Sequence, residues 1–132
     1  MRTNISSGAP WESIVGYSRA VRVGNMIEVA GTTAVDGDQL VGEGNAYQQS
    51  RFIFAKIQKA LEQAGSSMRD VVRTRMYVTT SNVIDDVLRA HGEVFVDIRP
   101  VATLVVVSAL INDKLLVEIE ASAIIDAVNN EQ

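Results

Sequence analysis

The sequence of 132 residues contains no cysteine and only one histidine, His91, and these two scarcities exclude several kinds of chemistry. Without cysteine the chain forms no disulfide, carries no thiolate nucleophile and builds no cysteine-ligated zinc site. A single imidazole cannot supply a site with several histidine ligands, so only subunits that share His91 could build one. We therefore expect no metal site and no cofactor.

Long uncharged apolar runs and an excess of basic residues are also missing. No window reaches the roughly 18 apolar residues that a membrane-spanning helix needs, and the N-terminal residues lack a basic segment followed by an apolar core. Twelve lysines and arginines against 16 aspartates and glutamates give a net charge of -4, which offers no broad basic surface to nucleic acid. We expect a cytoplasmic protein that binds neither membranes nor nucleic acid.

Apolar residues, by contrast, are plentiful. At 47 % hydrophobic residues the chain fits one compact domain over residues 1–132, with its core within about residues 9–125. Residues 1–16 contain two glycines and a proline without periodicity, which predicts an irregular lead-in. The tail over residues 126–132 is expected to fray.

Hydrophobic periodicity predicts the element order β-β-α-β-α-β-β. The expected strands cover residues 17–23, 26–31, 70–80, 101–109 and 115–125, and the expected helices cover residues 45–64 and about 82–95. Gly24 and Asn25 suit a tight hairpin turn, Gly65 suits the end of the first helix, and Ser81 or Asn82 could cap the second. Residues 36–44 form an exposed loop or a second small hairpin. Two helices on one face of a sheet make an α+β fold.

The polar and apolar faces of these elements can also be predicted. The strand over residues 70–80 alternates an apolar face with a face that carries arginines and a tyrosine; the apolar face is Val72, Thr74, Met76 and Val78, and the polar face is Arg73, Arg75 and Tyr77. The second helix has an inner stripe of Ile84, Val87, Leu88, His91 and Phe95. The last two strands are apolar on both sides, so the sheet face without helices is expected to be buried against other subunits.

Four blocks of the sequence resemble one known family, the RidA family, also called YjgF or L-PSP endoribonuclease-like. The blocks are "GYSRAVRVGNMIEVAGTT", "RTRMYVTTSN", "AHGEVFVDIRPVATLVVV" and "LLVEIEASA", and the resemblance runs from about Ala9 to Ala123. It implies a chorismate-mutase-like α+β subunit, a homotrimer whose sheets form a central barrel, and three ligand clefts between neighbouring subunits.

The resemblance also implies a chemistry and its residues. RidA hydrolyses reactive 2-enamine and 2-imine products of pyridoxal-phosphate enzymes to 2-keto acids and ammonia, with an arginine that holds the substrate carboxylate. By position, Tyr17 matches the cleft tyrosine and Glu118 the glutamate that orients the attacking water. The supporting serine is replaced by Ala30, next to Gly31, and the arginine by Ala102. A lost guanidinium removes a carboxylate clamp worth roughly 2 to 5 kcal/mol, so a 2-iminocarboxylate is not expected to bind in the RidA manner unless another cation substitutes.

Other residues have both a ligand-binding and a structural interpretation. Arg99 and Arg75 are candidates for the missing cation; the alternatives are a helix-end or interface contact for Arg99 and a subunit-bridging ion pair for Arg73 and Arg75. Trp11 either packs against the edge of the core or covers the ligand cleft beside Tyr17. Thr32 and Thr103 could replace the serine hydroxyl, although both also suit a sheet.

Two further sets of titratable groups have alternatives of the same kind. Glu118 and Glu120 share one strand face, where one of them could do acid–base work or pair with an arginine such as Arg75. His91, on the apolar edge of the second helix, is interpreted as a structural, half-buried histidine.

These observations predict a RidA-like trimer whose clefts bind a small, uncharged or weakly polar metabolite and hydrolyse it with water held by Glu118. The alternative is a non-catalytic module that binds ligands or partners. Classical 2-imino acid deamination is less favoured because of Ala102, and ribonuclease activity because the chain is acidic and has one histidine.

Overall fold

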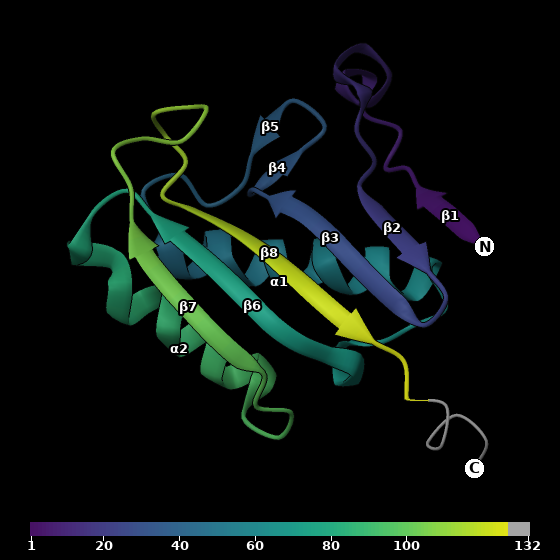
Figure 1. The fold of residues 1–132 in the computed structure, drawn as a ribbon. Coiled ribbons are helices and arrows are strands. Elements are labelled where there is room, and N and C mark those ends of the chain that lie inside the picture. Colours follow the sequence, from purple (N-terminus) through teal and green to yellow (C-terminus); the bar gives the residue numbers. More distant parts are fainter. Residues whose placement is uncertain (127–132) are drawn as a thin grey trace.

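Six strands form one mixed sheet in the computed structural model, which describes residues 1–126 (Figure 1). They are β1 (Arg2–Ile5), β2 (Ala20–Val23), β3 (Met26–Thr32), β6 (Val71–Val78), β7 (Val101–Val106) and β8 (Val117–Ile124). The order across the sheet is β1-β2-β3-β8-β6-β7, and every neighbouring pair is antiparallel except β6 and β7. The last strand of the chain therefore lies in the middle of the sheet, where β8 separates β3 from β6.

Two α-helices, α1 (Ala46–Gln63) and α2 (Ile84–Phe95), cover one face of this sheet and leave the other face open (Figure 1). Strands β4 (Val35–Asp36) and β5 (Gln39–Leu40) form a separate hairpin. A small hairpin was one of the two structures predicted for residues 36–44. Short helical turns lie at Glu12–Gly16, Met68–Asp70 and Ser81–Val83. The predicted α+β fold with two helices on one face is confirmed.

The core lies between the helices and the sheet. Its largest fully buried side chains come from both layers and include Ile27, Ile53, Ile57, Met76 and Ile119. Each such side chain stabilises the fold by about 1.5–3 kcal/mol relative to an exposed one. The helices cover the middle strands on this face, whereas the helix side of the edge strand β7 stays partly exposed, as at Val106.

Helix α1 begins and ends where its capping residues predict. The Asn45 side chain accepts a hydrogen bond from the Gln48 backbone N–H at 2.9 Å, which satisfies a donor that the first turn leaves free. After Ala64 the chain turns at Gly65, whose φ of 83° lies in the left-handed region. The expected helix over residues 45–64 is confirmed.

Three details of the prediction are wrong. The lead-in is not wholly irregular, because β1 pairs with β2 and Glu12–Gly16 forms a π-helical turn. The N-cap of α2 is Val83, which makes no side-chain capping hydrogen bond, rather than Ser81 or Asn82; Thr80 caps the preceding turn, where its side chain accepts from the Asn82 N–H. Leu88, placed on the inner stripe of α2, is 46 % exposed.

The start of β6 also differs from its predicted alternation. Val71 is buried and Val72 is exposed, whereas strict alternation from Thr74 places Val72 inside. The pairing of β6 with β8 shifts register between Val71 and Arg73, and this irregularity exchanges the two valines. From Arg73 to Val78 the predicted faces hold.

The open face is less apolar than expected. On β7 the prediction holds, because Val101 and Val105 point to this face and are 57 % and 42 % exposed. On β8 it does not: the open-face positions are Glu118, Glu120 and Ser122 before Ile124, and the buried residues alternate with them. The middle of the open face is therefore polar.

Two remaining expectations concern the whole chain. Within residues 1–126 no helix is long and apolar enough to cross a membrane. The expected fraying of the tail falls almost wholly on residues 127–132, which lie outside the described residues.

Candidate functional site

Paired side chains on β6 and β8 build the centre of the open face. The register sets Arg75 opposite Glu120 and Tyr77 opposite Glu118. The Tyr77 hydroxyl donates to Glu120 Oε1 at 2.8 Å, and Arg75 Nη1 lies 3.7 Å from the same oxygen. Of the two carboxylates on this face, Glu120 is thus the one that pairs with an arginine. These contacts hold its carboxylate in place.

Glu118 has a different environment. Within residues 1–126 its carboxylate accepts no hydrogen bond and joins no salt bridge. Burial first, and then the neighbouring charge of Glu120, raise the pKa of Glu118 above its usual range, while Arg19 acts in the opposite direction. Glu118 is therefore a half-buried carboxyl group that is free to bind water or a ligand and to exchange a proton.

Gly31 makes room for that carboxylate. A Cβ atom at Gly31 would meet Oε2 of Glu118 well inside contact distance. The register between β3 and β8 shifts between Val29 and Thr32, so the strand bulges where Gly31 lies. The backbone of β3 can approach Glu118 closely only because residue 31 has no side chain.

Arg19 lies on the other side of this bulge. Its Nη2 donates to the Gly31 carbonyl oxygen at 2.6 Å, and its Nε is buried with no hydrogen-bond partner in the described part of the chain. Burial lowers the pKa of Arg19, and its electrostatic interactions with Tyr17, Glu12 and Glu118 oppose that shift. Arg19, Tyr17 and Glu118 therefore share one electrostatic environment at Gly31.

The segment before β2 places Tyr17 next to Arg19. Glu12 is buried and accepts hydrogen bonds from the backbone N–H and the hydroxyl of Ser7, at 3.0 and 2.5 Å. Burial would raise the pKa of Glu12, but the hydrogen bonds from Ser7 outweigh it and the pKa is lowered. The Tyr17 N–H then donates to the Glu12 carbonyl, which closes the π-helical turn. An ionised Glu12 anchors the turn from which Tyr17 emerges.

Several predicted site residues join this cluster and others do not. Tyr17, Ala30, Gly31 and Glu118 lie together around the bulge. Thr32 is buried, and its hydroxyl donates to the Ala30 carbonyl oxygen within its own strand. It is therefore not a replacement for a ligand-binding serine in this structure.

Ala102 does not meet Glu118 within one chain. Ala102 pairs with Thr74, and Thr74 pairs with Ala121, so Ala102 points to the helix side of the sheet. Thr103 points to the open face, where its hydroxyl receives a hydrogen bond from Arg73 at 3.4 Å. The two β7 positions thus face opposite ways, and only Thr103 shares a face with Glu118.

The other candidates have structural roles or stay exposed. Arg99 lies four residues after the last residue of α2: its N–H donates to the Phe95 carbonyl oxygen, and its φ is 61°. His91 is half-buried against the rings of Phe54 and Phe95, with Nε2 2.8 Å from the Thr74 hydroxyl, as a structural histidine should be. Trp11 is 62 % exposed and closes over no core edge.

Two residues of the cluster were missed at the sequence level. Arg19 shares strand parity with Tyr17, so alternation alone could have placed the two side chains on one face. Glu12 had no such signal, because its burial depends on Ser7 and on the π-helical turn.

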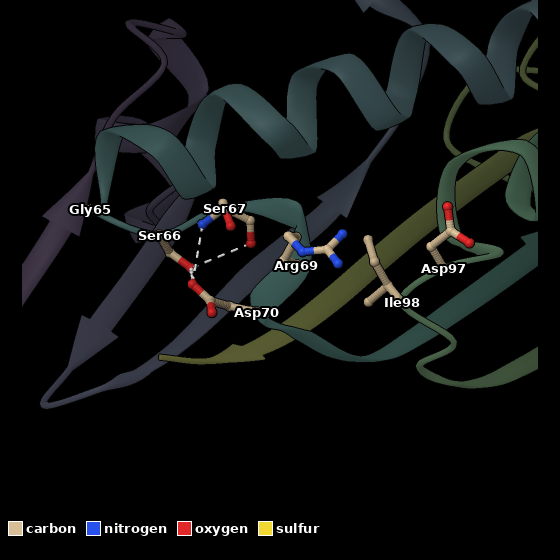
Figure 2. Close-up of a pocket in the computed structure, with 7 residues that line it drawn as sticks. All are labelled: Gly65, Ser66, Ser67, Arg69, Asp70, Asp97 and Ile98. Atoms are coloured by element: carbon tan, nitrogen blue, oxygen red, sulfur yellow. Dashed lines mark hydrogen bonds between the residues drawn. The ribbon is translucent and has the colours of Figure 1, made fainter. Parts of the chain in front are cut away.

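A hollow of about 700 Å³ lies away from this cluster, between the end of α1 and the end of α2 (Figure 2). It is lined by Gly65, Ser66, Ser67, Arg69, Asp70, Asp97 and Ile98. The Ser66 hydroxyl and the Ser67 N–H both donate to the Asp70 carboxylate, at 2.6 and 3.3 Å. These groups satisfy one another in a capping box, and none of them is a predicted site residue.

The fold and the cluster define an α+β domain with a carboxyl group on the open face of its sheet that is unpaired within residues 1–126. Residues 1–126 hold no group of three or more histidine, aspartate and glutamate side chains able to bind a metal ion. The family model described as Endoribonuclease L-PSP matches residues 7–125. The chain belongs to this family, which is the RidA/YjgF family that its sequence blocks resemble.

Individual proteins that this chain resembles support the family assignment. The chain is 42 % identical to the protein SCO2049 of Streptomyces coelicolor over 126 residues, which cover 96 % of this chain and 94 % of that protein. It is 34 % identical to the RutC family protein PYRAB12510 of Pyrococcus abyssi, over 81 % of this chain and 84 % of that one. The crystal structure of Rv2704 of Mycobacterium tuberculosis, a member of the YjgF/YER057c/UK114 family, matches with a TM-score of 0.85 and 47 % identity over 95 % of this chain and 100 % of that chain.

Proposed function

We propose that this protein is a hydrolase that acts on a small imine-type metabolite, with water positioned by Glu118, in clefts formed between copies of the chain. The observation that carries the proposal is the state of Glu118: half-buried, unpaired within residues 1–126 and raised in pKa, beside a Glu120 that Tyr77 and Arg75 hold. A carboxyl group whose pKa is raised toward neutral pH exchanges protons more efficiently than an ordinary one.

The reaction needs one group that moves a proton. Glu118 takes a proton from water as the oxygen attacks the imine carbon, and the proton passes to the nitrogen. Glu118 then carries the hydroxyl proton of the tetrahedral intermediate to the amino nitrogen, and the C–N bond breaks to give a carbonyl compound and ammonia. Tyr17, which acts electrostatically on Arg19, lies at the edge of the same cluster, and Gly31 provides the room in which the carboxylate lies.

The assembly proposed for these clefts is a homotrimer. It is supported by the family membership and by the uncovered valines of β7 on the open face. Since the sheet has helices on one side only, the open face is the surface through which copies can contact one another.

The alternative is a non-catalytic ligand-binding module. It is favoured by Ala30 and Ala102, which lack the polar groups that the resemblance expects at these positions. Both proposals place the ligand at Glu118, so the difference between them is turnover.

The experiment follows imine decay with the purified protein and in buffer, over a series of small aliphatic imines with and without a carboxylate. The wild type is expected to accelerate decay, and Glu118→Gln to lower the rate by about 100-fold or more. Glu28→Gln is the control, because Glu28 lies on the same face and only accepts a hydrogen bond from Ser122. Decay at the buffer rate with every imine would leave the binding module as the better interpretation.

A further inference from the structure

The chain leaves the sheet just after the bulge at Gly31. The register of β3 ends at Val29 with β2 and at Thr32 with β8, and the backbone then continues through Thr33 into β4, which begins at Val35. Thr33 and Val35 are half-buried, so their carbonyl groups need hydrogen-bond donors. A strand of the sheet is not there to supply them, and side chains take its place.

Lys56 of α1 supplies these donors. Its Nζ donates to the carbonyl oxygens of Thr33 and Val35, at 3.0 and 2.9 Å. The Val35 N–H also donates to the Thr33 carbonyl at 2.9 Å, so the backbone closes the turn and Lys56 joins that turn to α1. Hydrogen bonds from an ammonium group are stronger than those between neutral groups. The neighbouring Ile57 lies in the core, so α1 is a firm base for this contact.

Arg19 extends the same arrangement to the bulge itself. Its Nη2 donates to the Gly31 carbonyl at 2.6 Å, so the carbonyls of Gly31, Thr33 and Val35, three alternate residues, all accept from cationic side chains. Burial, and next the charge of Arg19, lower the pKa of Lys56, which shows that the two cations lie near each other. Their repulsion is offset by the carbonyl oxygens that both of them bind. Residues 31–35 are thus held by two side chains.

The position of this segment decides how Glu118 lies. Oε2 of Glu118 occupies the place that a Cβ atom at Gly31 would take, so a small movement of the Gly31 backbone changes the space around the carboxylate. We propose that Lys56 is a positioning residue of the Glu118 site: it holds the turn after β3 on α1 and thereby fixes the Gly31 backbone against the Glu118 carboxylate.

This inference rests on the proposed function for what the site does, and it adds a residue from the helix layer to a site on the opposite face of the sheet. Burial, Glu120 and Arg19 are what shift the pKa of Glu118. Lys56 therefore acts on this carboxylate through the backbone and not through its own charge.

The first test is spectroscopic and needs no substrate. Lys56→Met keeps an unbranched stem beside the Phe52 ring and removes the donors to the turn. The pKa of Glu118 is measured by NMR from the ¹³C shift of its carboxyl carbon in the wild type and the variant. We expect the Gly31 backbone to move away in Lys56→Met, and the pKa of Glu118 to fall toward its ordinary value as water reaches the carboxylate. A wild-type pKa of Glu118 in folded Lys56→Met would overturn the proposal.

Two variants separate positioning from a general loosening of α1. Lys59→Met is the matched control, because Lys59 lies three residues further along the same helix with an exposed side chain, and it should leave the pKa of Glu118 unchanged. Lys56→Arg restores a cationic donor and should return the pKa most of the way to the wild-type value. An equal effect of Lys59→Met, or no recovery in Lys56→Arg, would contradict the proposal.

Imine hydrolysis gives a second readout. Because Lys56 places the group that acts on water and does not hold the ligand, Lys56→Met should lower kcat at least about tenfold and leave KM within about twofold. An unchanged kcat would contradict the positioning role. If the wild type itself does not accelerate imine decay, the hydrolase is rejected, while the pKa of Glu118 still decides the role of Lys56.

A further variant covers the case in which Lys56→Met does not fold. Lys56→Gln keeps a neutral but shorter donor, and it is then measured in the same way. A lowered pKa of Glu118 in Lys56→Gln supports the proposal, and a wild-type pKa overturns it.

Discussion

At the scale of single residues, the site depends on a contact between two strands. Glu118 of β8 occupies the space that a side chain at position 31 of β3 would fill. The two residues are far apart in the sequence and meet because β8 inserts between β3 and β6. A glycine in this position marks a place where a functional side chain needs the volume.

Gly31→Ala should therefore separate activity from stability. The added methyl group collides with the far end of the Glu118 side chain, which can swing aside, and the backbone of Gly31 needs no left-handed φ. We expect the free energy of unfolding to fall by no more than about 1–2 kcal/mol, while imine hydrolysis falls nearly as far as in Glu118→Gln. Urea unfolding and the imine assay measure the two effects, and wild-type activity in a folded Gly31→Ala protein would show that the position of the carboxylate is not important.

At the scale of elements, the helices and the middle strands were predictable and the ends of the chain were not. The residues of α1 repeat with helical spacing and carry their own caps, and β6 alternates from Arg73 onward, so local pattern suffices there. Strand β1, "RTNI", has one buried residue in four, and its existence depends on pairing with β2. No local pattern contains that information.

The candidate site likewise combines residues that the sequence predicted with features that it did not predict. Position in the family blocks predicted Tyr17 and Glu118, because the spacing of those blocks reflects the fold. The bulge at Gly31, the burial of Arg19 Nε and the opposite orientations of Ala102 and Glu118 follow from register, which is decided between strands rather than within them. The register shift between Val71 and Arg73 likewise places Val71 and Val72 on the faces opposite to those that strict alternation predicts.

The packing of α2 on β6 makes the stability depend on pH. Burial lowers the pKa of His91 from its ordinary 6.5, since the imidazole lies between aromatic rings and bonds to the Thr74 hydroxyl. The unfolded chain therefore takes up this proton at a higher pH than the folded chain. The stability that the neutral ring contributes is present above about pH 6.5 and is lost as the pH falls through the lower, folded pKa.

His91→Asn, which keeps a polar group for Thr74, tests this. We expect the difference in unfolding free energy between wild type and variant to shrink as the pH is lowered from 7 to about 5, because the wild type loses a contribution that the variant lacks. Urea unfolding at several pH values measures it. Parallel pH profiles for the two proteins would show that His91 does not titrate differently in the folded state.

At the scale of the whole molecule, the uncovered face predicts assembly. We expect sedimentation at micromolar concentration to return a trimer, and Val105→Asp to dissociate or misfold it, because Val105 lies on the open face of β7 and a carboxylate buried there would be unpaired. Val96→Asp is the control, at an exposed position just after α2. A wild-type monomer at that concentration, or an intact trimer of the Val105→Asp variant, would contradict the prediction.

The charge of the whole molecule predicts weak contact with RNA, despite the name of the family model. With a net charge of -4, no appreciable affinity for unstructured RNA is expected at about 150 mM salt. Filter binding or fluorescence anisotropy measures it. Sub-micromolar binding, or cleavage by protein free of contaminating nuclease, would instead support a ribonuclease.

Strand β7 lies at the edge of the sheet and pairs on one side only, with β6. Its six residues, "VATLVV", carry no charge and no proline, and most of them are exposed. Uncharged edge strands rich in valine readily add strands from other molecules and are starting points for aggregation. Of the monomer and the proposed trimer, the monomer is consequently the form more prone to precipitate, so Val105→Asp should produce turbidity at temperatures where the sheet and helices are still folded.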